Sequence, residues 1–314
     1  MRATVLIAGP TASGKSGLAL ALARHFGGVV INADSMQVYG RLRILTARPD
    51  AAAEAAAPHR LYGVLAPDEV CSAARWASMA RAEIAAAHEA GRLAVVVGGT
   101  GLYFHALTEG LSDLPAVDPA VRQGLAAELA ALGAPALHAR LAGIDPALAA
   151  RLKPGDSQRI LRGLEIHAGT GRPLSSWQAA TAGDAPDIGL VARYVVAPPR
   201  PLLLQRIRLR LEQMAAEGAI EEARAVAALG LDALAPAAKA IGLRPFAAHA
   251  AGEIPLAAAI ERAEIETRQY AKRQMTWARG RMADWDWLGG AQETERIIGE
   301  IERKIREPGL TTQS

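Results

Sequence analysis

The sequence of 314 residues contains very little cysteine and no long apolar run. Its single cysteine, Cys71, excludes a disulfide framework and a cysteine metal cluster, and favours a reducing, cytoplasmic setting. No stretch of about 18 uncharged apolar residues occurs, so we expect no transmembrane helix. The seven histidines lack the spacing of metal ligands, so no zinc site is predicted. Because the start, "MRATVLIAGPTASGKS", runs straight into a glycine-rich segment, we expect no cleavable signal peptide.

The net charge is also small, at +3, so bulk charge identifies no partner and local clusters must be considered instead. Hydrophobic residues make up 51% of the chain, enough for the core of one large domain or two modest ones.

A phosphate-binding motif, G-x-x-x-x-G-K-[ST], is the strongest signal in the sequence. An apolar, strand-like run precedes it and a helix-like run follows it. In such a loop the glycines let successive N–H groups point at phosphate oxygens, the lysine adds a cation, and the serine can bind Mg²⁺. The predicted phosphate-binding residues are Gly9, Pro10, Thr11, Ala12, Ser13, Gly14, Lys15 and Ser16, with Ser16 as the metal ligand.

The sequence offers a single obvious acid to accompany this motif. A phosphate-loop ATPase usually has a second acid at the end of a neighbouring apolar strand, but the run "LAVVV" ends in Gly98, Gly99 and Thr100. The run "VVINADS" does supply Asp34, as a catalytic base, a metal ligand or both; the structural alternative is a helix N-cap. Thr100 is either a site residue or a plain turn residue.

Apolar strands alternate with helical segments, which predicts an α/β fold with a parallel, phosphate-loop NTPase-like sheet flanked by helices. The helical stretch 113–191 interrupts this alternation and predicts an all-helical insertion, with a core domain formed by 1–112 and 192–314. Asp-Pro pairs at 118–119 and 145–146 mark helix starts within it. Strands are expected within 5–8, 28–35, 93–101 and 192–199, and helices within 16–26, 71–90, much of 200–281, and 291–306.

Residues 267–281, "TRQYAKRQMTWARGR", form a basic stretch without acids, interleaved with Tyr270 and Trp277. Such a helix face suits a nucleic-acid backbone, although a merely solvated helix has the same pattern. Further basic stretches lie at 158–167 and after the last core strand, where an arginine could point back at the phosphate loop.

Six motifs occur in an order that resembles the bacterial tRNA dimethylallyltransferases. They are "GPTASGKS", "INADSMQVYGRLRILTARP", "VVGGTGLYFHAL", "RLKPGDSQRILRGLEI", "TGRPLSSWQ" and "ETRQYAKRQMTW". The resemblance spans about residues 3 to 286. It implies transfer of a dimethylallyl group from dimethylallyl diphosphate to N6 of the adenosine next to the tRNA anticodon, releasing pyrophosphate. The phosphate loop would then hold a leaving group.

The resemblance assigns roles to single residues. Asp34 matches the base that removes the N6 proton, and Thr100 matches a threonine that positions the amine. Lys15 and an arginine after the last core strand, matched to Arg206 with Arg210 as the alternative, stabilise the diphosphate together with Mg²⁺ on Ser16. We expect no membrane partner and a monomeric protein.

The expected RNA contacts come from three parts of the chain, with the helical insertion clamping the anticodon stem-loop. The target adenine must leave its stack to react, which is less costly in a single-stranded loop. The predicted tRNA-binding residues are Asp34, Ser35, Met36, Gln37, Thr100, Arg122, Gln158, Arg159, Ile160, Leu161, Arg162, Lys272 and Arg273.

The sequence departs from the family pattern at two places. "RILTARP" replaces a "DIGTAKP"-like segment, with Arg43 and Leu45, and "PHRLYG" replaces a "PHHLID"-like one. The rival functions are a kinase on the same fold, a prenyltransferase acting on free adenine nucleotides, and a non-catalytic RNA-binding protein. The strand ending in glycines disfavours the first, the insertion and basic helix disfavour the second, and the retained lysine, serine, aspartate and threonine disfavour the third.

Overall fold

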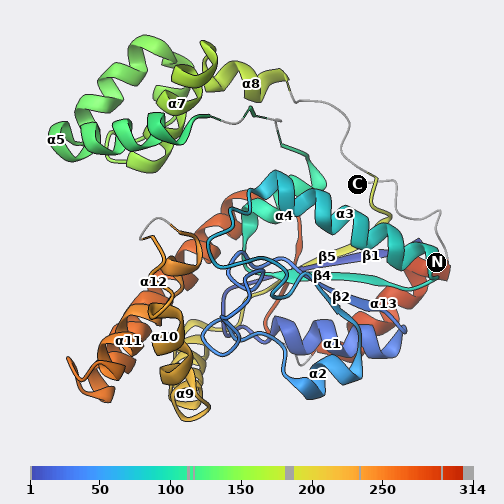
Figure 1. Ribbon diagram of the computed structural model, residues 1–314. Coiled ribbons are helices and arrows are strands. Elements are labelled where there is room, and N and C mark those ends of the chain that lie inside the picture. Colours follow the sequence, from blue (N-terminus) through green and yellow to red (C-terminus); the bar gives the residue numbers. More distant parts are fainter. Residues whose placement is uncertain are drawn as a thin grey trace. The chain divides into compact units, whose positions relative to one another are not determined.

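The computed structural model describes residues 2–111, 114–115, 117–180, 187–232, 235–290 and 293–306. The chain forms two compact units, shown in Figure 1. The larger unit joins Met1–Thr108 to Asp187–Ser314, and the smaller one is Glu109–Pro186.

The larger unit is built on a six-stranded sheet in the order β3-β2-β4-β1-β5-β6, in which every strand pair is parallel. Because the strands are parallel, all their carboxyl ends meet at one edge. The predicted α/β fold with a parallel sheet is therefore confirmed. The strands are β1 (Thr4–Ala8), β2 (Val29–Asn32), β3 (His59–Arg60), β4 (Ala94–Gly98), β5 (Leu190–Val196) and β6 (Asp286–Leu288).

Helices cover both faces of this sheet, as Figure 1 shows. The central strands β1, β2 and β4 are buried along their whole length, which explains their continuous apolar runs. On one face α1 (Lys15–His25) packs with α13 (Thr294–Arg306), whose Ile297 and Ile301 are fully buried in the core. The other face carries α3 (Ala73–Glu89) and α4 (Gly101–Thr108), with Trp76 stacked on Tyr103.

A second group of helices follows β5 and completes the larger unit beside the carboxyl edge. Its longest member, α12 (Leu256–Arg281), presents a buried stripe of small residues that includes Ala263, Ala271 and Ala278. The remaining helices of this unit are α2 (Ala51–Ala56), α9 (Arg200–Ala216), α10 (Ala219–Ala227), η1 (Ala237–Lys239) and α11 (Leu243–Ala250).

Helices are the only regular secondary structure among the described residues of the smaller unit, which has its own core around Leu141, Ile160 and Leu164. Asp118 and Asp145 cap helix starts with a proline in the first turn, as the Asp-Pro pairs predict. Gly133 interrupts the first helix with a non-helical backbone. Its helices are α5 (Pro119–Ile144), α6 (Pro146–Ala149), α7 (Ser157–Thr170) and α8 (Leu174–Ala180).

Some boundaries differ from those expected. The second strand ends at Asn32, and the fifth begins at Leu190, inside the range 113–191 expected to be helical. The short strands β3 and β6 were not predicted, because two or three residues of mixed polarity carry no periodic signal. Among the described residues, no helix has both the length and the apolar character needed to cross a membrane.

Candidate active site

Three loops converge at the carboxyl edge of the sheet. The glycine-rich loop 9–14 follows β1, the loop 33–37 follows β2, and the turn 99–100 follows β4. Gly98 makes this convergence possible, because a Cβ there would lie 2.1 Å from the carbonyl oxygen of Ala33. The sheet order places β1, β2 and β4 side by side, so the chemistry-bearing loops are neighbours.

Lys15 is the first residue of α1 and is almost fully buried. Its Nζ donates a hydrogen bond to the carbonyl of Pro10 at 3.1 Å, so the ammonium lies over the glycine-rich loop. Burial lowers the pKa of Lys15 to about 8, with Asp34 opposing the shift and Arg210 adding to it. A buried ammonium beside helix-terminal amides favours an anionic ligand.

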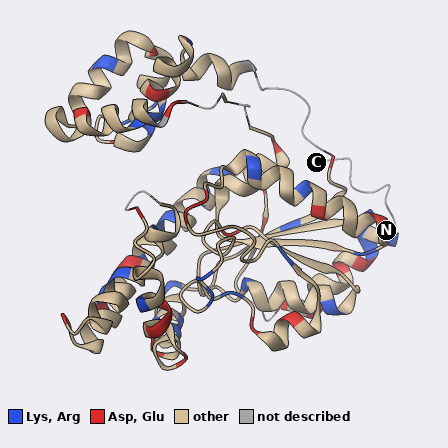
Figure 2. Cartoon of the chain, in the orientation of Figure 1, with Lys and Arg blue, Asp and Glu red and all other residues tan. Residues whose placement is uncertain are grey.

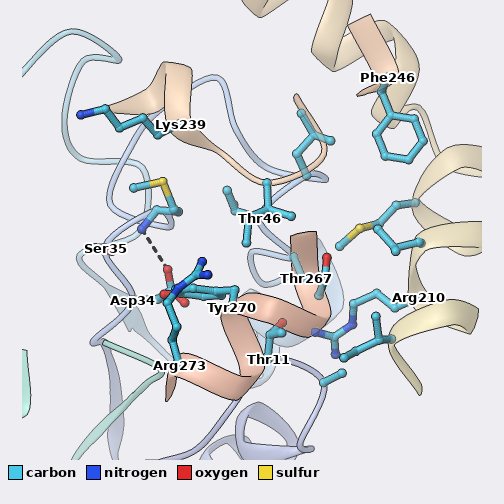
Figure 3. A pocket seen from close by; sticks show the side chains of 18 residues that line it. Thr11, Asp34, Ser35, Thr46, Arg210, Lys239, Phe246, Thr267, Tyr270 and Arg273 are labelled. Atoms are coloured by element: carbon cyan, nitrogen blue, oxygen red, sulfur yellow. Dashed lines mark hydrogen bonds between the residues drawn. The ribbon is translucent and has the colours of Figure 1, made fainter. Parts of the chain in front are cut away.

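Two arginines of α9 reach the same loop. Arg206 donates through Nη1 to the carbonyl of Ser13 at 3.2 Å. Arg210 lines the main pocket, and Figure 3 shows its guanidinium close to Thr11. Burial, together with the neighbouring Arg206, lowers the pKa of Arg210. Two guanidinium groups held this close leave a local excess of positive charge, which a diphosphate would neutralise.

Asp34 follows β2 and is held in a tight local turn. One of its carboxylate oxygens accepts the N–H of Met36 at 2.9 Å, as in an Asx turn. The fully buried Asn32 fixes the backbone of Asp34 by accepting its N–H at 2.8 Å and donating to its carbonyl at 3.0 Å. Asp34 therefore does make a local hydrogen bond, but no helix begins there and the carboxylate also lines the pocket.

Thr100 joins the turn after β4 to the loop after β2. Its hydroxyl oxygen accepts the N–H of Ser35 at 2.9 Å, and its own N–H donates to the carbonyl of Ala33 at 3.2 Å. The residue is more than a plain turn residue, because its side chain fixes the residue next to Asp34. Tyr270 lies at the same place, close to Thr100 and Ser35, and burial, with Asp34 nearby, raises the pKa of its phenol.

The main pocket of the larger unit has a volume of about 230 Å³. Residues of both the glycine-rich loop and the loop after β2 line it. Figure 3 shows Asp34, Tyr270 and Arg273 grouped on one side, with Arg210 and Thr11 nearby. Arg273 lies over the Tyr270 ring, 5.6 Å from its centre. The remaining wall is largely apolar and includes Leu45, Ile207, Leu211, Met214, Ile241 and Phe246. Charged groups at one end and apolar side chains at the other suit a ligand with an anionic head and a hydrocarbon part.

The segment 43–47, where the sequence departs from the family pattern, forms part of the wall. The Glu222 carboxylate on α10 accepts the N–H groups of Arg43, Ile44 and Leu45 at 2.8 to 2.9 Å. Gln37, half-buried, donates through Nε2 to the carbonyls of Thr46 and Ala47. The segment is therefore fixed from both sides, and Gln37 acts on the wall without lining the pocket.

The predicted RNA-binding residues of the smaller unit lie on α5 and α7. Arg122 and Arg162 both bind the buried Glu165, with N–O distances of 2.9 and 3.0 Å. Gln158 and Arg159 are exposed at the start of α7, and Leu161 packs partly against the unit's core.

Ile160 has a fully buried side chain. It lies among leucines of the smaller unit and stabilises α7, so a contact of Ile160 with RNA would have to use its main chain and stays a prediction. Its apolar character and its spacing from Leu164 were the signal that could have identified it as a core residue.

A metal ion bound by protein groups alone does not fit this site. Among the residues that the structure describes, no three His, Cys, Asp or Glu side chains cluster as metal ligands. Ser16 is exposed in the first turn of α1, beside Lys15. This single hydroxyl suits Mg²⁺, which typically takes one or two protein ligands and completes its shell with phosphate oxygens and water.

Three residues that shape the site carried no sequence signal strong enough to identify their role. Asn32 and Glu222 hold backbone segments of the pocket wall, and Gln274 on α12 contacts the phosphate loop. A buried polar residue ending an apolar strand was the available clue for Asn32. Glu222 and Gln274 act through partners more than 170 residues away in sequence, which no local pattern reveals.

Comparison with known proteins gives a consistent result. The model of the IPP transferase family matches residues 37–281. A tRNA dimethylallyltransferase of Rhodospirillum centenum is 55% identical over 283 residues, covering 90% of each chain. One from Parvibaculum lavamentivorans is 52% identical over 307 residues, covering 98% of this chain and 97% of the relative.

Solved structures agree with these relatives. The full-length tRNA isopentenylpyrophosphate transferase of Bacillus halodurans has a TM-score of 0.66 at 33% identity, covering 98% of this chain and 99% of that one. A eukaryotic dimethylallyltransferase acting on tRNA has a TM-score of 0.80 at 25% identity, covering 100% of this chain and 82% of that one.

Proposed function

The chain belongs to the IPP transferase family, and from this premise we propose that it transfers a dimethylallyl group from dimethylallyl diphosphate to a tRNA adenosine. The observation that carries the proposal is the arrangement of the pocket. Asp34, Arg210 and Arg273 line one side of the pocket, Lys15 and Thr100 lie beside Asp34, and the remaining wall is largely apolar. Cations for a diphosphate, a carboxylate for an amine and an apolar wall for the hydrocarbon group are what this transfer requires.

The acceptor half of the reaction falls to Asp34. The adenine N6 attacks the first carbon of the dimethylallyl group, forming a C–N bond as the C–O bond breaks. The bonding electrons of the C–O bond leave with the diphosphate, and Asp34 takes the N6 proton. Thr100, Ser35 and Tyr270 hold this end of the pocket and position the amine.

The cationic groups act on the diphosphate of the prenyl donor. Lys15, the amides of the glycine-rich loop and Arg206 or Arg210 stabilise the negative charge that grows on the diphosphate. Ser16 would help to hold Mg²⁺, which would supply further charge neutralisation. We propose Arg210 as the arginine that touches the diphosphate, because it lines the pocket while Arg206 already donates to the loop backbone.

The RNA is proposed to bind two surfaces, one in each unit. Lys272 and Arg273 on α12 supply the first; Figure 2 shows charges of both signs along the helices of this region. Arg122, Arg162, Gln158 and Arg159 supply the second and would grip the anticodon stem-loop. A tRNA substrate agrees with the cytoplasmic location expected from the sequence. The expected monomeric state stays a prediction that light scattering can test.

One assay tests the proposal. The purified protein is incubated with dimethylallyl diphosphate, Mg²⁺ and an anticodon stem-loop carrying the target adenosine. Nucleoside analysis by mass should then show one added C₅H₈ group, with pyrophosphate released one-for-one. A parallel reaction with ATP and no prenyl donor should give no ADP. Stoichiometric ADP without prenylated adenosine would overturn the proposal in favour of a kinase.

A further inference from the structure

Gln274 is a buried polar residue in the middle of α12, only 8% exposed. Its carboxamide oxygen accepts the N–H of Thr11 at 2.9 Å, and its Nε2 donates to the carbonyl of Gly99 at 2.9 Å. Both ends of the amide are thus used, and both partners are main-chain groups of other segments. A carboxamide in this arrangement fixes its partners in distance and in direction, because donor and acceptor cannot exchange places.

The two partners belong to the two halves of the active site. Thr11 lies in the glycine-rich loop, and Gly99 directly precedes Thr100. Thr100 in turn holds Ser35, the neighbour of Asp34, through a 2.9 Å hydrogen bond. The chain of contacts from the phosphate loop to the base therefore runs through Gln274, Gly99 and Thr100.

The backbone around Gln274 is fitted to it. A Cβ on Gly99 would lie 2.0 Å from its Nε2, and a Cβ on Gly101 would lie 1.9 Å from Cδ1 of Trp277. Glycines at both positions let α12 approach the turn after β4 closely. The same helical turn also contributes Tyr270 and Arg273 to the pocket, so the spacing set by Gln274 is transmitted to the pocket wall.

We propose that Gln274 is a positioning residue that holds the phosphate loop and the Asp34–Thr100 half of the site at the separation required for prenyl transfer. This inference rests on the proposed function. Gln274 does not touch the reacting atoms; it acts through the Thr11 amide and the Gly99 carbonyl. Because transfer needs the amine and the allylic carbon in contact with water excluded, a small change in loop separation affects the chemical step more than the binding of either substrate.

The main variant is Gln274→Met, which keeps the length of the side chain and removes both hydrogen bonds. The matched control is Gln269→Met, the same change at an exposed position of α12. We expect Gln274→Met to lower kcat about 100-fold with KM for both substrates within about three-fold, the effect typical of a misplaced reactant. Pyrophosphate should also exceed prenylated RNA, because water reaches the allylic carbon. The control should match the wild type.

A second variant approaches the same contact from the other side. Gly99→Ala places a methyl group where the Gln274 carboxamide lies, so it should show the same loss of kcat and the same excess of pyrophosphate. The double variant Gly99→Ala/Gln274→Met should be no slower than the slower single variant, because both break one linkage. Fully additive losses would overturn the proposal.

A measurement independent of activity separates this inference from the proposed function. Hydrogen exchange of the Thr11 amide should be faster in Gln274→Met than in the wild type and in Gln269→Met, since its acceptor is lost. If the wild type makes no prenylated RNA, the proposed function fails while this exchange result still tests the linkage. Unchanged exchange, or a raised KM with normal kcat and one-for-one pyrophosphate, would overturn the positioning role.

Discussion

At the scale of single residues, the site depends on polar side chains that hold backbone as much as on those that face substrate. The motif predicts Lys15 and Asp34, since a phosphate loop and a carboxylate at a strand end are local patterns. Such patterns do not reveal Asn32 and Gln274, because the roles of these residues depend on contacts with main-chain groups elsewhere in the sequence. Asn32 donates to the carbonyl of Leu61, and Gln274 donates to the carbonyl of Gly99. Local sequence patterns therefore indicate candidate reactive groups more readily than the groups that hold them in place.

The Asp34→Asn variant should nearly abolish transfer while preserving the local fold. An asparagine retains an oxygen that accepts the Met36 N–H, so the turn survives, but it cannot take the N6 proton. We expect single-turnover rates to fall about 10²- to 10⁴-fold, the range for a general base, with tRNA affinity within a few-fold. Asp50→Asn, the same change at the exposed N-cap of α2, is the control. Full activity of Asp34→Asn would end the assignment.

Lys15 should make pyrophosphate binding sensitive to alkaline pH. Burial lowers the pKa of Lys15 to about 8, with Arg210 adding to the shift and Asp34 opposing it, so the free protein loses this cation as pH rises through 8. A Lys15→Arg variant keeps its charge throughout. Calorimetry with inorganic pyrophosphate and no added metal should show the wild-type Kd rising relative to that of the variant between about pH 7 and 9.5. The ratio of the wild-type Kd to the variant Kd cancels the titration of pyrophosphate itself. A ratio that stays constant across this pH range would show that Lys15 stays charged.

At the scale of elements, the sequence predicts the helices and strands that have a strong hydrophobic pattern or clear start and stop signals. The buried strands β1, β2 and β4 are continuous apolar runs, and α13 has isoleucines on one face, of which Ile297 and Ile301 are buried. The strands β3 and β6 are too short to carry a pattern and exist because they pair with β2 and β5. The position of α12 against the phosphate loop also needed the structure, since its small-residue stripe specifies close packing without specifying a partner.

The basic face of α12 should contribute measurable phosphate contacts. Lys272 is exposed, whereas Arg268 already pairs with Glu264 at 3.6 Å. Fluorescence titration of an anticodon stem-loop at several salt concentrations gives the slope of log binding constant against log salt concentration. This slope should flatten by roughly one for Lys272→Ala or Arg273→Ala. Arg268→Ala is the matched control and should change the slope less, because its charge is partly compensated. Affinity that does not depend on salt would mean that the helix is merely solvated.

At the scale of the whole molecule, the chain forms two units, each with its own hydrophobic core. The pocket, the glycine-rich loop and the proposed base all belong to the larger unit. The smaller unit has no part in that pocket, and its arginines Arg122 and Arg162 gather around the buried Glu165. Two arginines on one carboxylate leave one net positive charge, pre-oriented at the surface, which favours a phosphate of a polyanion.

This division makes a variant in the smaller unit a selective probe. Arg162→Ala should raise the KM for tRNA several-fold, flatten its salt dependence by roughly one, and leave the affinity for dimethylallyl diphosphate unchanged, because the proposed donor site lies wholly in the other unit. Arg140→Ala removes an arginine that pairs with Glu128 in the same unit and serves as the control. Steady-state kinetics with each substrate varied in turn, at two salt concentrations, measures both effects. A change in donor affinity equal to the change in tRNA affinity would show that Arg162 acts through the fold, and RNA recognition would then have to lie elsewhere.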